Sequence, residues 1–138
     1  MRLRSPEDLE RLRKRAQAER KEREGKKGIV LCAGTGCRGA GALEVWEAFR
    51  REIGERADVR LMNTCCHGFC ERGPIVIVEP EGIFYQRVTP KDVAEIVAET
   101  LNGGKLIERL LYKDPKTGEP IPYEKDIPFY KKQKRLIF

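Results

Sequence analysis

The chain has 138 residues, enough for one domain with a hydrophobic core and too few for two domains of ordinary size. Charged residues make up 36% of the chain, and its formal net charge is +6. No apolar run approaches the roughly 18 residues of a membrane-spanning helix, and the N-terminal stretch is charged, so we expect neither a membrane span nor a secretion signal.

The positive charge lies in the two flanks of the chain. Residues 1–27 carry 11 Lys or Arg against six Asp or Glu, residues 28–103 carry eight against 11, and residues 104–138 carry nine against five. A nucleic-acid-binding protein concentrates positive residues on one structured face. Because the central segment is net acidic, we expect no nucleic-acid partner.

A charged helix is predicted near the N-terminus. Ser5 is a favourable N-cap, Pro6 suits the first helical position, and the helix should run to about Glu24. Its narrow apolar stripe, which should pack on a surface, consists of Leu9, Leu12 and Ala16. Two interpretations stay open, a docking arm and a helix that is solvated all round.

The central segment begins with the pattern of a strand-helix-strand unit. Residues 28–31 form a short apolar run that ends at Cys32, as a buried strand does. A glycine-rich loop over residues 32–41 follows, and residues 42–53 show helical periodicity. Residues 59–64 predict a second strand, which again ends at cysteines.

A hairpin and a helix complete this segment. The β-branched residues 75–78, the turn at 81–82 and residues 83–88 predict two antiparallel strands. A capping pattern at 89–92 starts a helix that Gly103-Gly104 should end. The order βαβ-ββα is that of the thioredoxin fold, so we predict an α/β domain with a four-stranded mixed sheet.

The pattern changes after residue 104. A turn at 114–118 and several prolines predict an extended arm that covers a surface. The apolar residues expected to anchor this arm are Leu110, Leu111, Tyr112, Phe129, Tyr130 and Phe138. We therefore divide the chain into a charged N-terminal helix at 1–27, a thioredoxin-like domain at 28–104 and a C-terminal arm at 105–138.

Four of the five cysteines fall in two loops that should lie side by side. Cys32 and Cys37 share the glycine-rich loop, and Cys66 and Cys70 share the loop after the second strand. Parallel strands present their C-terminal ends at one edge of a sheet, so the four thiols should converge there. An odd, crowded set of cysteines suits a metal site in a reducing cytoplasm better than paired disulfides.

Soft thiolate ligands select zinc or an iron-sulfur cluster. The cysteine pairs of zinc sites usually have two to four intervening residues, so Cys32 and Cys37 fit zinc permissively, although neither pair has the common C-x2-C spacing. Longer intervals in glycine-rich loops leave room for bridging sulfides. A thiol redox centre is disfavoured because it also needs C-x2-C. Two positive residues, Arg38 and Arg72, lie near these loops in the sequence. We interpret His67 as a loop residue without a chemical role, and a proton-linked role is the alternative.

The cysteine motifs carry a family resemblance. CAGTGC at 32–37 and TCCHGFCERGP at 64–74 resemble the thioredoxin-like 2Fe-2S ferredoxin domain. This domain occurs in the small subunit of NADH:quinone oxidoreductase and at the N-terminus of the NADH-binding subunit of multimeric, electron-bifurcating hydrogenases and formate dehydrogenases. The hydrogenase-type domain is the more similar one, and further segments that resemble it are 83–85, 89–93, 107–118 and 127–133.

The resemblance implies one 2Fe-2S cluster on Cys32, Cys37, Cys66 and Cys70, with electron transfer as the function. Cys65 departs from the family pattern, in which glycine is frequent at this position, and a swap of Cys65 for Cys66 stays open. The implied partners are a flavin- and NADH-binding subunit and other iron-sulfur subunits, and a homodimer is a further option. A cytoplasmic location follows, either free or peripheral to a membrane complex, without direct membrane insertion.

Two other functions compete with electron transfer along the main route. In one, a structural zinc holds the loops of a non-catalytic docking module. In the other, the cluster modulates electron flow from a side position. No catalytic triad, phosphate-binding loop or pair of catalytic carboxylates is recognisable, so we expect no enzymatic activity from this chain alone.

Overall fold

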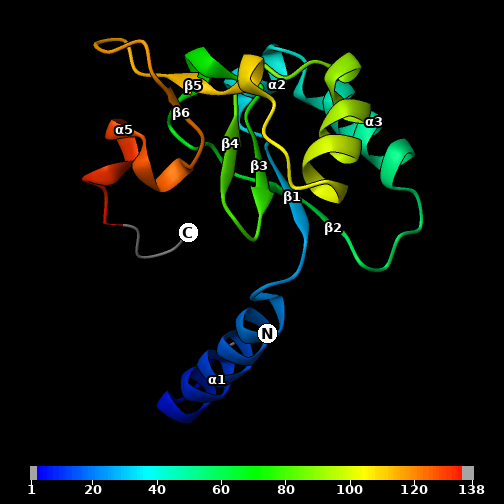
Figure 1. Ribbon diagram of the computed structural model, residues 1–138. Coiled ribbons are helices and arrows are strands. Elements are labelled where there is room, and N and C mark those ends of the chain that lie inside the picture. Colours follow the sequence, from blue (N-terminus) through cyan, green and yellow to red (C-terminus); the bar gives the residue numbers. More distant parts are fainter. Residues whose placement is uncertain (1–2, 135–138) are drawn as a thin grey trace.

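The computed structural model describes residues 3–134 and contains a four-stranded mixed sheet in the order β2-β1-β3-β4 (Figure 1). Its strands are β1 (Gly28–Cys32), β2 (Arg60–Thr64), β3 (Val76–Glu79) and β4 (Ile83–Tyr85). β1 pairs with β2 in parallel, and β3 pairs with both β1 and β4 in the antiparallel sense. The predicted thioredoxin-like α/β fold is confirmed.

The register of β1 and β2 brings the two cysteine loops to one edge of the sheet. Cys32, the last residue of β1, is the partner of Thr64, the last residue of β2. Because the strands are parallel, the chain leaves both of them in the same direction. The segments that carry Cys37 and Cys66 therefore start next to each other.

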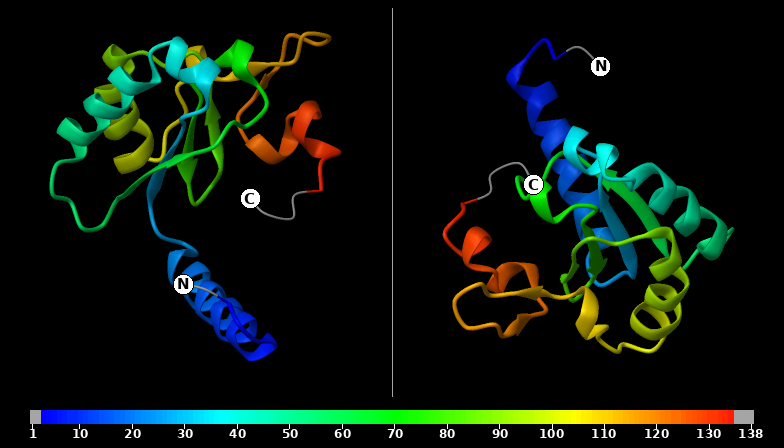
Figure 2. Two further views of the ribbon diagram at one scale, coloured as in Figure 1. Left: turned by 180° about the vertical axis from the view of Figure 1, so that it is seen from behind. Right: turned by 90° about the horizontal axis from the view of Figure 1, so that it is seen from above.

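Helices cover one face of the sheet. The crossover helix α3 (Ala42–Ile53) packs against α4 (Val93–Glu95), and α4 continues as the π-helix η3 (Ile96–Asn102) (Figures 1 and 2). The predicted capping pattern is confirmed, since Thr89 and Asp92 exchange hydrogen bonds around the 3₁₀ turn η2 (Pro90–Asp92). No helix in the described part of the chain has the length and apolar character needed to cross a bilayer.

Two elements differ from their sequence-based expectation. The loop expected at 32–41 contains a short helix, α2 (Thr35–Gly39). The fourth strand, expected to reach residue 88, ends at Tyr85 because Arg87 adopts a left-handed conformation with φ 51°. A left-handed residue interrupts the extended backbone that a strand requires.

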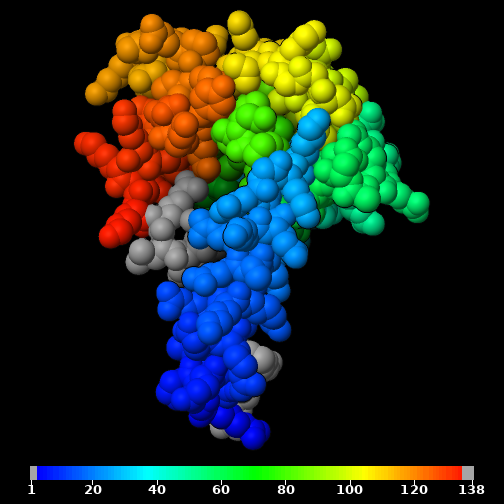
Figure 3. All heavy atoms as spheres, turned by 60° about the horizontal axis from the view of Figure 1, so that its bottom comes forward, coloured from blue at the N-terminus to red at the C-terminus, as the bar shows by residue number. Residues whose placement is uncertain are grey.

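The N-terminal helix α1 (Pro6–Arg23) projects from the body of the molecule (Figures 1 and 3). Ser5 caps it as predicted, accepting a hydrogen bond from the backbone N–H of Asp8. None of its residues is buried, and Leu9 is 57% exposed, so the expectation that its apolar stripe packs on a surface is wrong within this chain. Ion pairs along the helix, such as Arg15–Glu19, take the place of packing.

The C-terminal arm folds back onto the domain. It forms a small hairpin between β5 (Tyr112–Lys113) and β6 (Pro120–Ile121). Around the hairpin lie the short helical elements η4 (Glu108–Leu110), η5 (Glu124–Asp126) and α5 (Pro128–Lys131).

Backbone bridges tie the arm to the outer strand of the sheet. They join Tyr85 to Leu111 and Ile83 to Tyr123, so the arm covers the edge of β4. The arm thus covers a surface as predicted, but a hairpin and short helical turns interrupt the extended backbone that was expected. Four of its expected anchors, Leu110, Leu111, Tyr112 and Tyr130, are buried, Phe129 is 42% exposed, and Phe138 lies outside the described residues.

The arm also reaches the face of the sheet opposite the helices. Tyr85 of β4 hydrogen-bonds Thr100 of η3 on the helical face, with 2.6 Å between the hydroxyl oxygens. Its neighbour Phe84 must point to the other face, because side chains alternate along a strand. There the Phe84 ring lies 6.0 Å from the ring of Tyr130 in the arm. The sheet is therefore covered on both faces.

Candidate metal centre

Four thiols meet where the two cysteine loops leave the sheet. The Sγ atoms of Cys66 and Cys70 are 3.2 Å apart. The Cys32 thiol is near enough to raise the pKa of Cys37 and to contribute to the lowered pKa of Cys66. All four predicted site residues are thus brought together where the two loops meet.

Glycines make the close approach of the two loops possible. A Cβ atom built on Gly34 would lie 2.8 Å from Cβ of Cys66, and one on Gly36 would lie 2.8 Å from Cβ of Cys70. A Cβ on Gly73 would lie 2.6 Å from Sγ of Cys37. All three distances are shorter than real carbon contacts, so any side chain at these positions would force the loops apart.

Cys65 takes a different position from its neighbour Cys66. Its side chain is exposed, and within residues 3–134 no hydrogen bond reaches its thiol. Its backbone carbonyl, in contrast, lies 3.7 Å from Sγ of Cys32 and accepts a hydrogen bond from that thiol. Among residues 3–134, the exposed thiol of Cys65 therefore takes no part in the thiol contact that joins Cys66 and Cys70.

The site is half buried. Cys32 and Cys37 are enclosed, whereas Cys66 and Cys70 are exposed at the surface. Burial, with the nearby Cys32 thiol, raises the pKa of Cys37 to about 12. Hydrogen bonds from the Cys70 thiol and from the Gly68 N–H lower the pKa of Cys66, and the same Cys66 group raises the pKa of Cys70. Within the exposed pair, Cys66 is thus the more acidic thiol.

The donor set fits an iron-sulfur cluster. The sulfurs lie in an inner, buried pair, Cys32 and Cys37, and an outer, exposed pair, Cys66 and Cys70. Two irons with bridging sulfides take two thiolates each, whereas one tetrahedral zinc needs all four around a single point.

The loop that carries Cys66 and Cys70 is held by contacts that the sequence did not indicate. His67 bonds Thr64, with 2.8 Å between Nε2 and Oγ1, and its Nδ1 lies 3.4 Å from Oε1 of Glu124. The Phe69 ring stacks on the Phe129 ring at 4.8 Å. Glu124 and Phe129 both belong to the C-terminal arm. The only sequence signal for these contacts is the abundance of aromatic residues in the arm, which does not identify their partners.

The two arginines predicted near the site occupy different environments. Arg38, on α2, is exposed. The Arg72 guanidinium lies beside two rings, 6.0 Å from the centroid of Phe69 and 5.6 Å from that of Tyr112. Cation–π contacts of this kind hold a positive charge in place, two residues after Cys70.

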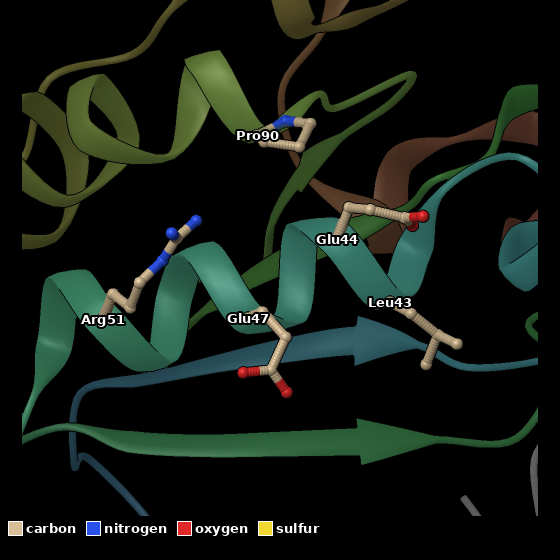
Figure 4. A pocket seen from close by; sticks show the side chains of 5 residues that line it. All are labelled: Leu43, Glu44, Glu47, Arg51 and Pro90. Carbon is tan, nitrogen blue, oxygen red and sulfur yellow. The ribbon is translucent and has the colours of Figure 1, made fainter.

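A shallow hollow beside α3 lies apart from the thiols. It has a volume of about 390 Å³ and is lined by Leu43, Glu44, Glu47, Arg51 and Pro90. Figure 4 shows Glu44 and Arg51 on the side of α3 that faces Pro90, with Glu47 and Leu43 directed away from it. The hollow contains no cysteine and no histidine, so it is not the candidate site.

Comparison with known proteins gives consistent matches. The family model described as thioredoxin-like [2Fe-2S] ferredoxin matches residues 18–101. A 2Fe-2S ferredoxin of Clostridium pasteurianum is 40% identical over 77 residues, which are 54% of this chain and 76% of the relative. A 2Fe-2S ferredoxin of Aquifex aeolicus is 40% identical over 81 residues, 54% of this chain and 71% of the relative.

Solved structures agree with these matches. The crystal structure of the thioredoxin-like [2Fe-2S] ferredoxin from Aquifex aeolicus aligns with a TM-score of 0.59 and 32% identity, over 64% of this chain and 98% of that protein. An NAD+-reducing [NiFe]-hydrogenase aligns with a TM-score of 0.50 and 13% identity, over 63% of this chain and 17% of the hydrogenase chain. The second likeness concerns the fold alone.

Proposed function

This chain belongs to the thioredoxin-like [2Fe-2S] ferredoxin family, carries one 2Fe-2S cluster and transfers electrons, and we propose that Cys32, Cys37, Cys66 and Cys70 are the ligands of the cluster. The observation that carries the proposal is the convergence of these four cysteines where the two loops meet, with 3.2 Å between the Sγ atoms of Cys66 and Cys70. The glycines at 34, 36 and 73 support it, because each faces one of the four cysteines at a distance that excludes a side chain.

The unequal burial of the thiols leaves only one side of the site open to a redox partner. When bound, the cluster supplies a one-electron redox couple. Cys66 and Cys70 are exposed, so a redox partner can approach the site on their side, while Cys32 and Cys37 face the core. The positive charge of Arg72, two residues after Cys70, favours the extra negative charge of the reduced state, and the ion pair of Arg72 with Glu71 offsets part of this effect.

We further propose that the chain works in an NADH-linked oxidoreductase of the hydrogenase type, with a flavin-containing NADH-binding subunit and other iron-sulfur subunits as partners. The resemblance of the cysteine motifs supports this, as does the fold likeness to part of an NAD+-reducing hydrogenase. Five free thiols suit a reducing, cytoplasmic compartment. Reduction by NADH only when such a subunit is added would support the assignment, and reduction by NADH alone would contradict it.

The ligand assignment is tested by electron paramagnetic resonance of the dithionite-reduced protein, with iron and sulfide assayed on the same sample. We expect about two irons and two sulfides per chain and a rhombic signal. The signal should disappear or change its shape in Cys66→Ser and stay unchanged in the matched control Cys65→Ser. The opposite result for these two variants would move the ligand to Cys65. A colourless protein with one zinc per chain would leave a structural docking module as the function.

A further inference from the structure

We propose that Tyr130, in the C-terminal arm, is a positioning residue that raises the reduction potential of the cluster through the peptide group between His67 and Gly68. The proposal rests on the assignment of Cys66 as a ligand. It concerns a residue outside the segment that the family model matches, which ends at residue 101. The effect would therefore come from the C-terminal arm, which lies beyond the segment that the family model matches.

A single peptide group connects the arm to the ligand sulfur. The Tyr130 hydroxyl donates a hydrogen bond of 3.2 Å to the backbone carbonyl oxygen of His67. The N–H of Gly68, at the other end of the same peptide group, donates a hydrogen bond of 3.2 Å to Sγ of Cys66. Hydroxyl, peptide group and sulfur thus form one relay of two hydrogen bonds.

The two bonds strengthen each other. A donor at the carbonyl oxygen polarises the peptide group, and the N–H of a polarised peptide group becomes a better donor. Hydrogen bonds to ligand sulfurs stabilise negative charge and are one of the factors that set cluster potentials. The reduced site carries one more negative charge than the oxidised site, so the relay stabilises the reduced state more.

The surrounding contacts hold the peptide group in this orientation. The His67 ring is fixed on one side by Thr64 and on the other by Glu124. Gly68 has a φ of +79°, which favours glycine, and a Cβ built there would lie 3.5 Å from the Phe129 ring. Two adjacent residues of the arm, Phe129 and Tyr130, therefore act on the same peptide group.

The burial of the relay makes it effective. Tyr130 is 5% exposed, and its ring contacts the rings of Phe69 and Phe84 at 6.0 Å each. Water is largely excluded from the hydroxyl, so no solvent molecule can readily take over its role. Removal of the hydroxyl keeps the aromatic ring and deletes its hydrogen bond to the carbonyl oxygen of His67.

The test compares Tyr130→Phe with Tyr123→Phe in the full chain with its cluster. Tyr123 belongs to the same arm, and among residues 3–134 no hydrogen bond reaches its hydroxyl, so it is the matched control. The midpoint potential is measured by redox titration, and the iron–sulfur stretching frequencies by resonance Raman spectroscopy in H2O and D2O. We expect a lower potential and a smaller deuterium shift in Tyr130→Phe, and values of the parent protein in Tyr123→Phe.

Two outcomes would overturn the proposal: an unchanged potential in Tyr130→Phe, or an equal decrease in both variants. If Tyr130→Phe fails to take up the cluster, 3-fluorotyrosine is placed at position 130 and measured below its own pKa. As a stronger donor it should raise the potential, and no change would again refute the relay. Failure of the ligand assignment is distinguishable, because Cys66→Ser would then leave the cluster signal intact whatever the Tyr130 variants show.

Discussion

At the residue scale, the site depends on glycines that have no side chain as much as on the cysteines. Gly36 stands directly opposite Cys70, with 3.1 Å between its built Cβ position and Sγ of that cysteine. Gly39 lies in the same short helix, and nothing lies within 4 Å of its built Cβ position. The two glycines differ in their surroundings alone, because neither has a positive φ.

Gly36→Ala should therefore reduce cluster content strongly, and Gly39→Ala should not. The added methyl group of Gly36→Ala pushes the loops apart and misplaces Cys70, whereas that of Gly39→Ala points into open space. Iron per chain, assayed after reconstitution under the same conditions, provides the measurement. Equal iron content in both variants would show that the loops have more freedom than the structure indicates.

The residue-level prediction from sequence succeeded where spacing and topology act together. The two loops were predicted to meet because parallel strands end at the same edge of a sheet, and the structure confirms that the four thiols converge there. Spacing could not separate Cys65 from Cys66, since adjacent residues fit the same interval. Tyr130 could not be identified either, because 63 residues separate it from His67.

At the scale of secondary-structure elements, a buried carboxylate stabilises the turn η2, which leads into helix α4. Asp92 accepts hydrogen bonds from the N–H and the hydroxyl of Thr89, and Arg109 pairs with its other oxygen at 2.6 Å. Burial alone favours the neutral carboxyl, but the hydrogen bonds from Thr89 and Arg109 outweigh it and hold the pKa of Asp92 below its ordinary value.

Asp92→Asn should lower the free energy of unfolding by about 1 kcal/mol at neutral pH, as loss of a helix cap does. A lowered pKa in the folded state means that the carboxylate stabilises the fold above its ordinary pKa, and that this contribution disappears as the pH falls through the lowered value. Urea unfolding at neutral and acidic pH checks both points. The exposed Asp58, which pairs with Arg56, provides the control, and Asp58→Asn should have little effect.

Caps and periodicity predicted most elements correctly. Ser5 and Thr89 mark their helices because the signal is local and chemical, and the apolar runs at β1 and β3 reflect burial on both faces of the sheet. Conformations set by tertiary contacts were not predictable. Examples are the short helix α2, the π-helical end at 96–102 and the left-handed Arg87 that ends β4.

At the scale of the whole molecule, α1 and the C-terminal arm have opposite roles, although both flanks are basic. The arm buries several anchors and covers the outer strand, whereas α1 buries none of its residues. Sequence composition could not distinguish the two, since sparse apolar residues among charges occur in both flanks. The proposed domain boundaries at residues 27 and 104 remain predictions.

Deletion of residues 1–24 should leave the stability of the domain and its cluster unchanged. Helix α1 contributes no buried surface to the core, and its ion pairs join residues within the helix itself. The midpoint of chemical unfolding and the iron content of the shortened protein test this. A clear decrease in either value would indicate a contact between α1 and the domain that the structure does not show.

The position of α1 also sets the reach of the molecule. The helix has 18 residues, so it is about 27 Å long, and it joins the start of β1, whereas Cys32 lies at the other end of that strand (Figure 1). Gly25, with φ +78°, lies in the short connection between α1 and β1. A molecule that binds the N-terminal end of α1 leaves the cysteine-bearing edge of the sheet accessible. One partner can therefore hold the protein while another exchanges electrons with it.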